Sequence, residues 1–89
     1  MAWRIELSAH AERGLNELDS EPRKRILKFV FEGLANLDDP RSIGHPLRGQ
    51  RLGELWRYRV RDYRLISEIQ DDRLLILIVK VGHRREVYL

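Results

Sequence analysis

The apolar residues of this chain change their spacing part-way along the sequence, and this change restricts the possible folds most. Between residues 8 and 40 they recur every three or four positions, as on one face of a helix. After residue 54 they alternate with polar residues, and Leu74–Val81 is almost wholly apolar, as in a central strand covered on both faces. The pattern therefore predicts helices first and a sheet second, which is an α+β fold.

Local signals divide the first half of the chain. Ala2–Leu7 alternates and predicts a short strand. Ser8 and Ser20 have side chains that cap helix starts, and Asp38-Asp39-Pro40 ends the second helix. The two helices form a hairpin. The core face of the second helix is expected to carry Ile26, Phe29, Val30, Gly33, Leu34 and Leu37.

The second half predicts strands after a Gly-, Pro- and Arg-rich loop at residues 40–53. The strands are expected at Glu54–Val60, Tyr63–Ile69 and Leu74–Val81, and a short one at Glu86–Leu89. Gly82-His83-Arg84-Arg85 is expected to break the sheet. We therefore predict one domain over residues 1–89, with an N-terminal strand, a helical hairpin and an antiparallel sheet of three to four strands.

The sequence also leads us to expect that several classes of protein and of site are excluded. The sequence has no cysteine, which excludes disulfides and thiolate chemistry and fits a reducing cytoplasm. The N-terminus lacks the pattern of a signal peptide, and the longest apolar run is too short to span a bilayer. His10 and His45 lie far apart with no ligand spacing, so we expect no metal and no cofactor. We expect a cytoplasmic protein without a membrane partner.

Positive charge is concentrated in the second half. Residues 1–40 carry a net −2, whereas residues 41–89 carry +5. All but three of the 17 basic residues are arginines, whose planar donor fork suits phosphate. An arginine-rich basic half favours an anionic partner, with nucleic acid first. A merely soluble basic surface is the alternative.

A two-residue turn at Arg61-Asp62 would gather arginines on one face of a hairpin. In that register Arg59 pairs with Arg64, and directly opposed residues share a face. One face then carries Arg57, Arg59 and Arg64, and the other Trp56, Tyr58, Val60, Tyr63 and Leu65. Like charges that oppose each other destabilise a sheet. Because a ligand with several phosphates would relieve this repulsion, the arginine face favours a phosphate site. The alternative is a solvated face with ion pairs to Glu54, Asp62 or Glu68.

The same stretch resembles the RelE/ParE toxins. The similar segments are Pro46-Leu47-Arg48-Gly49, Gly53-Glu54-Leu55-Trp56-Arg57-Tyr58-Arg59 and Asp62-Tyr63-Arg64-Leu65. The ending Val81-Gly82-His83-Arg84-Arg85-Glu86-Val87-Tyr88 resembles the RelE branch in particular. The resemblance is dense from residue 46 to 88, and it is carried by the spaced combination of segments.

The resemblance implies a toxin of a type II toxin–antitoxin pair with the RelE-like microbial RNase fold. RelE-like members cleave messenger RNA in the ribosomal A site without a metal, and so inhibit translation. The implied partners are a cognate RelB-like antitoxin that wraps around the toxin, the ribosome and its mRNA. Operator DNA is bound only through the antitoxin complex.

The resemblance also assigns roles to residues. The implied catalytic residues are Arg59, Arg64, His83, Arg84 and Tyr88. The resemblance also places a basic residue of the family's site on Arg57, and we expect Arg48, Arg57, Arg61 and Arg85 to bind RNA or phosphate.

Two departures from the best-known RelE pattern affect these roles. That pattern has lysines at the positions of Arg57 and Arg59, and it continues past the tyrosine into a further helix, where this sequence ends at Leu89. Arginine is a poor general base because its pKa is about 12.5 or above. Arg59 is therefore expected to hold phosphate rather than act as a base. Alternatively, the ribosome orients the 2′-OH and so lowers the demand for a base.

Two other side chains are candidates for proton transfer or hydrogen bonding. Histidine is the side chain that ordinarily titrates near neutrality, so His83 is a candidate acid or base. Tyr88 could donate a hydrogen bond, stack on a base or shift a proton. A solvated loop histidine and a packed terminal aromatic ring are the alternatives.

Three functions remain open on sequence alone. The first is a ribosome-dependent mRNA endoribonuclease, which the arginine face and the C-terminal segment favour. The second is a ParE-like toxin that inhibits DNA gyrase by binding it, without nuclease activity. The third is a nucleic-acid-binding module without toxicity, which would show salt-sensitive binding but no growth arrest.

Overall fold

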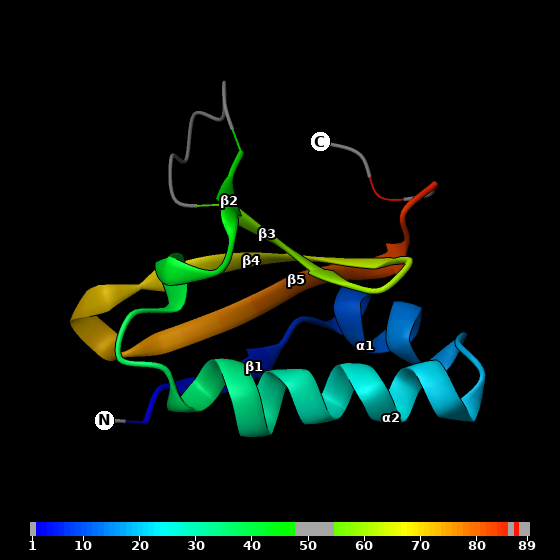
Figure 1. The fold of residues 1–89 in the computed structure, drawn as a ribbon, viewed down its shortest axis with the longest axis horizontal. Helices are drawn as coiled ribbons and strands as arrows, with labels where there is room; N and C mark the ends of the chain where they lie inside the picture. The colour runs from blue at the N-terminus through cyan, green and yellow to red at the C-terminus, as the bar shows by residue number, and fades with distance from the viewer. Residues whose placement is uncertain (1, 48–54, 86, 88–89) are drawn as a thin grey trace.

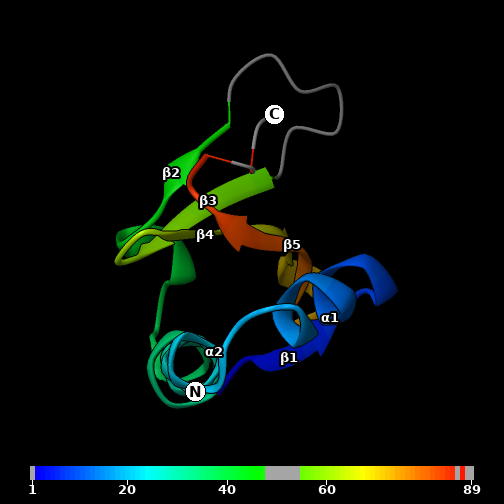
Figure 2. The ribbon, with the colours of Figure 1, turned by 90° about the vertical axis from the view of Figure 1, so that its right-hand side faces the viewer.

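The chain folds into two layers, with helices packed against one face of a sheet (Figure 1, Figure 2). The computed structural model describes residues 2–47, 55–85 and 87. The strands are β1 (Arg4–Leu7), β2 (His45–Pro46), β3 (Leu55–Val60), β4 (Tyr63–Gln70) and β5 (Leu75–His83). They form one sheet in the order β1-β5-β4-β3-β2. The predicted α+β class is confirmed.

The sheet differs from the predicted one in size and direction. It has five strands among the described residues rather than three to four, and β1 runs parallel to β5 while the other pairs are antiparallel. The N–H of Arg4 donates to the Leu74 carbonyl at 2.8 Å, and that of Ser8 to the Ile78 carbonyl at 2.9 Å. Because β5 is almost wholly apolar, an unpaired edge there would invite aggregation, and β1 covers it.

The first helix, α1 (Ala9–Asn16), begins as the sequence predicts. The Ser8 hydroxyl oxygen accepts the N–H of Ala11 at 3.0 Å, which is the expected N-cap. The same hydroxyl donates to the carbonyl of Val79 at 3.1 Å, so the cap also fixes the helix start against β5. An added Cβ on Gly14 would lie 2.4 Å from the Val81 carbonyl oxygen. Only glycine therefore allows α1 to approach β5 this closely.

The second helix, α2 (Ser20–Lys28), begins one residue earlier than predicted. Asp19 occupies the cap position and Ser20 is already helical, so the assignment of Ser20 as the cap is wrong. The helical path continues through a π turn, η1 (Phe29–Gly33), and a 3₁₀ turn, η2 (Leu34–Asn36). It thus ends just before the predicted stop.

The helical layer buries the expected face of this helix with one exception. Ile26, Val30 and Leu34 are buried, and Phe29 and Leu37 are partly buried. Gly33 is exposed, so its predicted place in the core is wrong. It closes the π turn, whose wider spiral turns the following residues relative to a regular helix.

The segment from the end of the helical layer to β3 connects the helices with the sheet. It contains a 3₁₀ turn, η3 (Pro40–Ser42), before the short β2. The buried Tyr58 hydroxyl donates to the Pro40 carbonyl at 2.7 Å, which ties this turn to β3. β4 is followed by a 3₁₀ turn, η4 (Asp71–Arg73), and by Leu74 with a φ of 48°. No helix within the described ranges is both long and apolar enough to cross a membrane.

The end of β5 corrects one prediction. The strand continues through Gly82 and His83, which were expected to break the sheet. His83 still pairs with Tyr63 at the start of β4, so the backbone partners on the hairpin extend the strand beyond the apolar run. The predicted final strand at Glu86–Leu89 falls largely outside the described residues, and Val87 itself is not in a strand.

Candidate functional site

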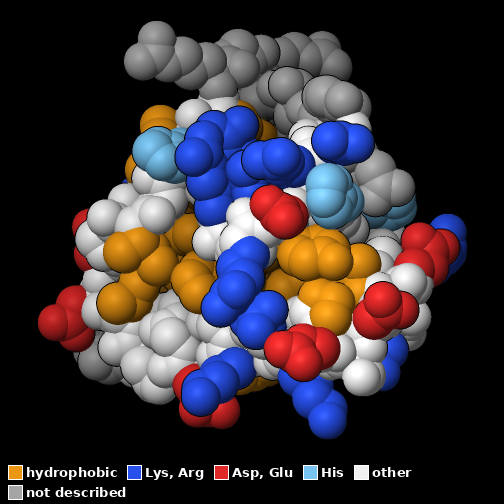
Figure 3. Space-filling view, turned by 45° about the vertical axis from the view of Figure 1, so that its right-hand side comes forward, with side chains coloured by type: hydrophobic (Ala, Val, Ile, Leu, Met, Phe, Trp, Pro, Cys, Tyr) orange, Lys and Arg blue, Asp and Glu red, His pale blue; other side chains and the backbone are white. Residues whose placement is uncertain are grey.

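Five arginines surround one hollow on the sheet face away from the helices. Its lining consists of Arg57, Arg59, Arg64, Arg84, Arg85 and Val87, and its volume is about 440 Å³. We call it the arginine hollow. Figure 3 shows a dense cluster of Lys and Arg side chains in the upper part of the molecule, whereas lower down such side chains are mixed with acidic ones. Hairpin and C-terminal arginines, distant in sequence, thus meet in space.

The hairpin register brings three of these arginines together. Arg59 pairs with Arg64 and Val60 with Tyr63, so the predicted two-residue turn at Arg61-Asp62 is confirmed. Arg61 adopts a positive φ of 56°, which an arginine rarely does outside a tight turn. This turn sets the parity of both strands. Burial follows it: Tyr58, Val60 and Leu65 lie in the core while the arginines lie on the other face.

An irregularity in β5 changes which residues of this strand face the arginines. Ile66 pairs with Lys80 but Ser67 pairs with Ile78, so Val79 is an extra residue without a partner on β4. The Ser8 hydroxyl donates a hydrogen bond to the Val79 carbonyl oxygen. Strict alternation from Ile78 would turn Lys80 into the core; the bulge turns it to the arginine face instead.

Gly82 lies directly opposite Arg64 beyond this bulge and so belongs to the arginine face. A Cβ at this position would come within 3.0 Å of Val87 Cγ2. The missing side chain therefore lets Val87 pack onto the strand and form one wall of the hollow.

The hollow concentrates positive charge with little compensation. Arg64 donates to the carbonyl oxygens of Arg61 and Tyr63, both at 3.0 Å. The pKa of Arg64 is lowered, first by burial and then by repulsion from Arg59, Arg57 and Arg84, while Asp62 acts in the opposite sense. A bound anion would reverse this effect.

The remaining contacts leave guanidinium donors available. The Nε of Arg57 is buried and has no hydrogen-bond partner among the residues that the structure describes. Arg84 lies 3.9 Å from the Asp62 carboxylate, which is a loose and exposed ion pair. Its backbone N–H donates to the Asp62 carbonyl at 2.7 Å, which fixes the segment beside the turn. Several convergent guanidinium groups suit a ligand with several anionic oxygens, such as a phosphodiester.

Two predicted site residues lie outside the hollow. His83 pairs with Tyr63 and therefore lies on the core side of the sheet. The centroids of the two rings lie 5.7 Å apart, in an edge-to-face arrangement. Its Nδ1 accepts the backbone N–H of Arg85 at 3.2 Å. Arg61 is exposed in the turn and contributes its carbonyl to Arg64. Arg48 and Tyr88 lie outside the described residues.

Sequence reasoning missed Val87 as part of the lining. Its only signal was its place five residues after Gly82, and nothing local shows that a valine there folds back onto the strand. Within residues 2–47, 55–85 and 87, no group of three or more His, Cys, Asp or Glu side chains is placed to hold a metal ion.

Comparison with known proteins places this geometry in a family. The family described as "ParE toxin of type II toxin-antitoxin system, parDE" matches residues 5–88. The chain belongs to this family. It is a RelE-like toxin within the RelE/ParE superfamily, as the sequence resemblance predicted.

Two relatives match along nearly the whole chain. The toxin RelG of Mycobacterium tuberculosis is 28% identical over 88 residues, covering 99% of this chain and 98% of that protein. The mRNA interferase toxin RelE of Escherichia coli is 27% identical over 92 residues, covering 99% of this chain and 92% of that protein.

Solved structures share the fold. The RelBE2 toxin–antitoxin complex of Mycobacterium tuberculosis contains a chain with a TM-score of 0.84 and 27% identity, covering 97% of this chain and 95% of that chain. The archaeal RelE–RelB complex of Pyrococcus horikoshii has a TM-score of 0.76 and 26% identity, covering 98% and 100%. Both structures are complexes of a toxin with its antitoxin.

Proposed function

We propose that this toxin is a ribosome-dependent, metal-independent endoribonuclease that cuts messenger RNA and so stops translation in the cytoplasm. The observation that carries the proposal is the convergence of five arginines on one hollow. The relative from Escherichia coli is named as an mRNA interferase, which supports the same chemistry. An enzyme that acts on RNA needs such a cationic surface facing its substrate.

The proposed reaction is an in-line attack within one strand. The 2′-oxygen bonds to the adjacent phosphorus and loses its proton, while the bond from phosphorus to the 5′-oxygen breaks and that oxygen gains a proton. The products are a 2′,3′-cyclic phosphate and a 5′-hydroxyl; water then opens the cyclic phosphate to a 3′-phosphate. Charge builds on the phosphoryl oxygens in the transition state, where fixed donors stabilise it most.

We assign that stabilisation to Arg59, Arg64 and Arg84, with Arg57 and Arg85 holding neighbouring phosphate oxygens. Burial and then repulsion from its arginine neighbours lower the pKa of Arg64, and a bound anion would offset both effects. The described lining consists of arginines and a valine, so it offers no side chain suited to act as a base near neutral pH. Dependence on the ribosome would supply what is lacking, because ribosomal contacts can orient the 2′-OH.

His83 and Tyr88 remain predictions as proton-transfer groups. Because its Nδ1 accepts from Arg85, His83 is better placed to hold the Arg84-Arg85 segment than to reach a phosphate in the hollow. A His83→Gln variant separates the two roles. Loss of the acid or base would change the pH dependence of cleavage, whereas loss of positioning would lower the rate equally at every pH.

We further propose a cognate RelB-like antitoxin as the inhibitory partner, with operator DNA bound only through their complex. The solved relatives from Mycobacterium tuberculosis and Pyrococcus horikoshii are toxin–antitoxin complexes, which supports this partner. An antitoxin that covers the arginine hollow would block the proposed reaction directly.

A second candidate is inhibition of DNA gyrase, favoured by the family match to ParE toxins. Induced expression with separate measurements of protein and DNA synthesis distinguishes the two. Prompt translation arrest with messages cut on ribosomes supports the nuclease. DNA damage with intact messages overturns it in favour of gyrase.

Alanine variants test the site within the same assay. Arg64→Ala and Arg84→Ala should each relieve arrest, while Arg73→Ala, an exposed arginine in η4, should not. Full toxicity of both site variants would refute the assignment of the hollow.

A further inference from the structure

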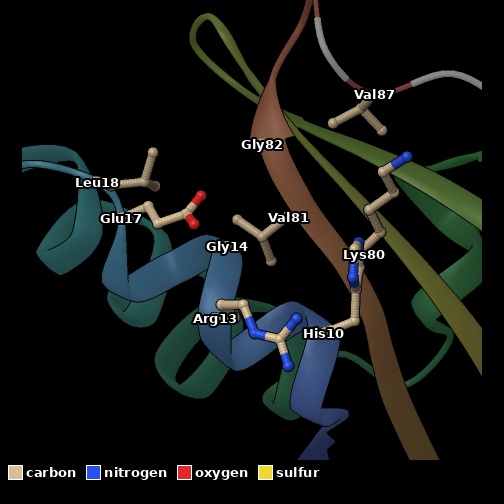
Figure 4. Close-up of a pocket in the computed structure, with 9 residues that line it drawn as sticks. All are labelled: His10, Arg13, Gly14, Glu17, Leu18, Lys80, Val81, Gly82 and Val87. Atoms are coloured by element: carbon tan, nitrogen blue, oxygen red, sulfur yellow. The ribbon is translucent and has the colours of Figure 1, made fainter.

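A second basic hollow lies between α1 and the end of β5. It has a volume of about 310 Å³, and its basic lining consists of His10 and Arg13 from α1 and Lys80 from β5. We call it the α1 hollow. Figure 4 shows the Lys80 chain extending toward Val87 and the His10 ring below it. Among the residues that the structure describes, Glu17 is the one carboxylate in this lining, and Figure 4 shows it beside Leu18, away from Lys80.

The basic groups of this hollow have no close ion-pair partner among the described residues. No ion pair within the described part of the chain involves His10, Arg13 or Lys80, and none involves Glu17. Folding gains nothing from gathering three basic side chains without partners. A ligand with negative charge would be attracted by Arg13 and Lys80, and the His10 ring could donate a hydrogen bond to it.

Lys80 owes its position to the bulge at Val79. It shares a sheet face with the arginines, since the Ile66–Lys80 pair lies two residues along the strands from the Arg64–Gly82 pair. The two hollows are also contiguous, because Val87 lines both of them. The two hollows therefore adjoin at Val87, so one extended strand could reach both.

We propose that the α1 hollow is a second phosphate site, which takes a backbone phosphate of the same RNA strand that the arginine hollow binds. This rests on the proposed nuclease function. Phosphates recur at every nucleotide, so a strand held at the arginine hollow carries further phosphates along this surface. Leu18, Val81 and Val87 would also suit an apolar peptide. RNA is favoured because the α1 hollow adjoins the proposed catalytic hollow at Val87 and carries Arg13 and Lys80 in its lining.

The test measures the salt dependence of RNA binding. Each phosphate contact to a single strand contributes about 0.7 to the slope of log affinity against log salt concentration. The probe is a single-stranded RNA that is 2′-O-methylated throughout, so it cannot be cut by 2′-OH attack. The variants are Lys80→Gln and Arg13→Gln, singly and together. Lys28→Gln, which removes an exposed lysine of α2, is the matched control.

We expect the double variant to lose about one contact, a fall of about 0.7 in the slope, while Lys28→Gln leaves the slope unchanged. A Lys80→Arg variant should keep the slope of the unaltered protein, because arginine carries the same positive charge that Lys80→Gln removes. An RNA too short to reach beyond the arginine hollow should bind the double variant and the unaltered protein equally. A uniform loss with both RNAs would overturn the proposal in favour of a structural defect.

Arg64→Ala separates this proposal from the function on which it rests. If Arg64→Ala lowers the slope and the double variant does not, the second site is refuted while the arginine hollow stands. If neither changes the slope, both phosphate assignments fail. If the double variant binds RNA normally but binds an acidic antitoxin peptide more weakly, the α1 hollow is a peptide site and the proposal is wrong.

Discussion

The two faces of the β3–β4 hairpin are made from alternate residues of the same strands but follow opposite rules. On the core face, Tyr58 and Leu65 oppose each other and are almost fully buried. On the other face, Arg59 and Arg64 oppose each other as like charges. The core face lowers the free energy of the fold, and the arginine face raises it. The phosphate site that we propose on the second face would account for this difference, because a bound anion would relieve the repulsion.

Leu65→Ala should give the largest effect on stability. Removing a fully buried leucine side chain costs about 2–5 kcal/mol, because transfer energy is lost and a cavity remains. In a chain of this size each kcal/mol lowers the Tm by roughly 4–8 °C. Thermal unfolding measures the shift. Below the new Tm the folded variant should still cut messages, and loss of cleavage without loss of stability would contradict the division between the faces.

Arg64→Ala changes the neighbouring residue and should do the opposite. We expect cleavage of ribosome-bound messages to fall by about 100-fold or more, the order seen when one transition-state donor is removed. The Tm should be unchanged or slightly higher, because the repulsion from Arg59, Arg57 and Arg84 is relieved. A fall in Tm like that of Leu65→Ala would mean that the arginine has a structural role instead.

Tyr58 makes the core face sensitive to alkaline pH. Burial raises the pKa of Tyr58 to about 12, and its hydroxyl donates to the Pro40 carbonyl. Stability from the neutral hydroxyl is therefore complete below pH about 10 and is lost as the pH rises towards 12. Tyr58→Phe should cost about 1–2 kcal/mol at neutral pH and remove much of this alkaline loss. An equally steep alkaline loss in the variant would exclude Tyr58 as its source.

An ordinary exposed ion pair gives the smallest effect and a useful contrast with the arginine hollow. Arg41 contacts Asp71 through two hydrogen bonds of 2.9 and 2.8 Å, which lower the pKa of Asp71. Its stabilisation is present at neutral pH and is lost as the pH falls through the lowered pKa.

Asp71→Asn should cost less than about 1 kcal/mol at neutral pH, and the difference from the unaltered protein should vanish in acid. Denaturant unfolding at the two pH values measures it. A large cost would show that this exposed pair stabilises the protein more than such pairs usually do.

Local patterns were enough to predict much of the fold. Alternation along β3 and β4, together with the two-residue turn, fixed which residues are buried and that Arg59 faces Arg64. The helix cap at Ser8 was likewise visible in the sequence. These features depend on residues close together in the chain, so backbone geometry alone determines them.

Long-range packing decided the rest. The addition of β1 to the sheet, the bulge at Val79 and the side of the sheet on which His83 lies all depend on contacts with distant residues. The hydroxyl of Ser8 binds the carbonyl of Val79 across more than seventy positions, a pairing that no local pattern contains. Because one extra residue in a strand reverses the facing of all that follow, the bulge decided which C-terminal side chains join the arginines.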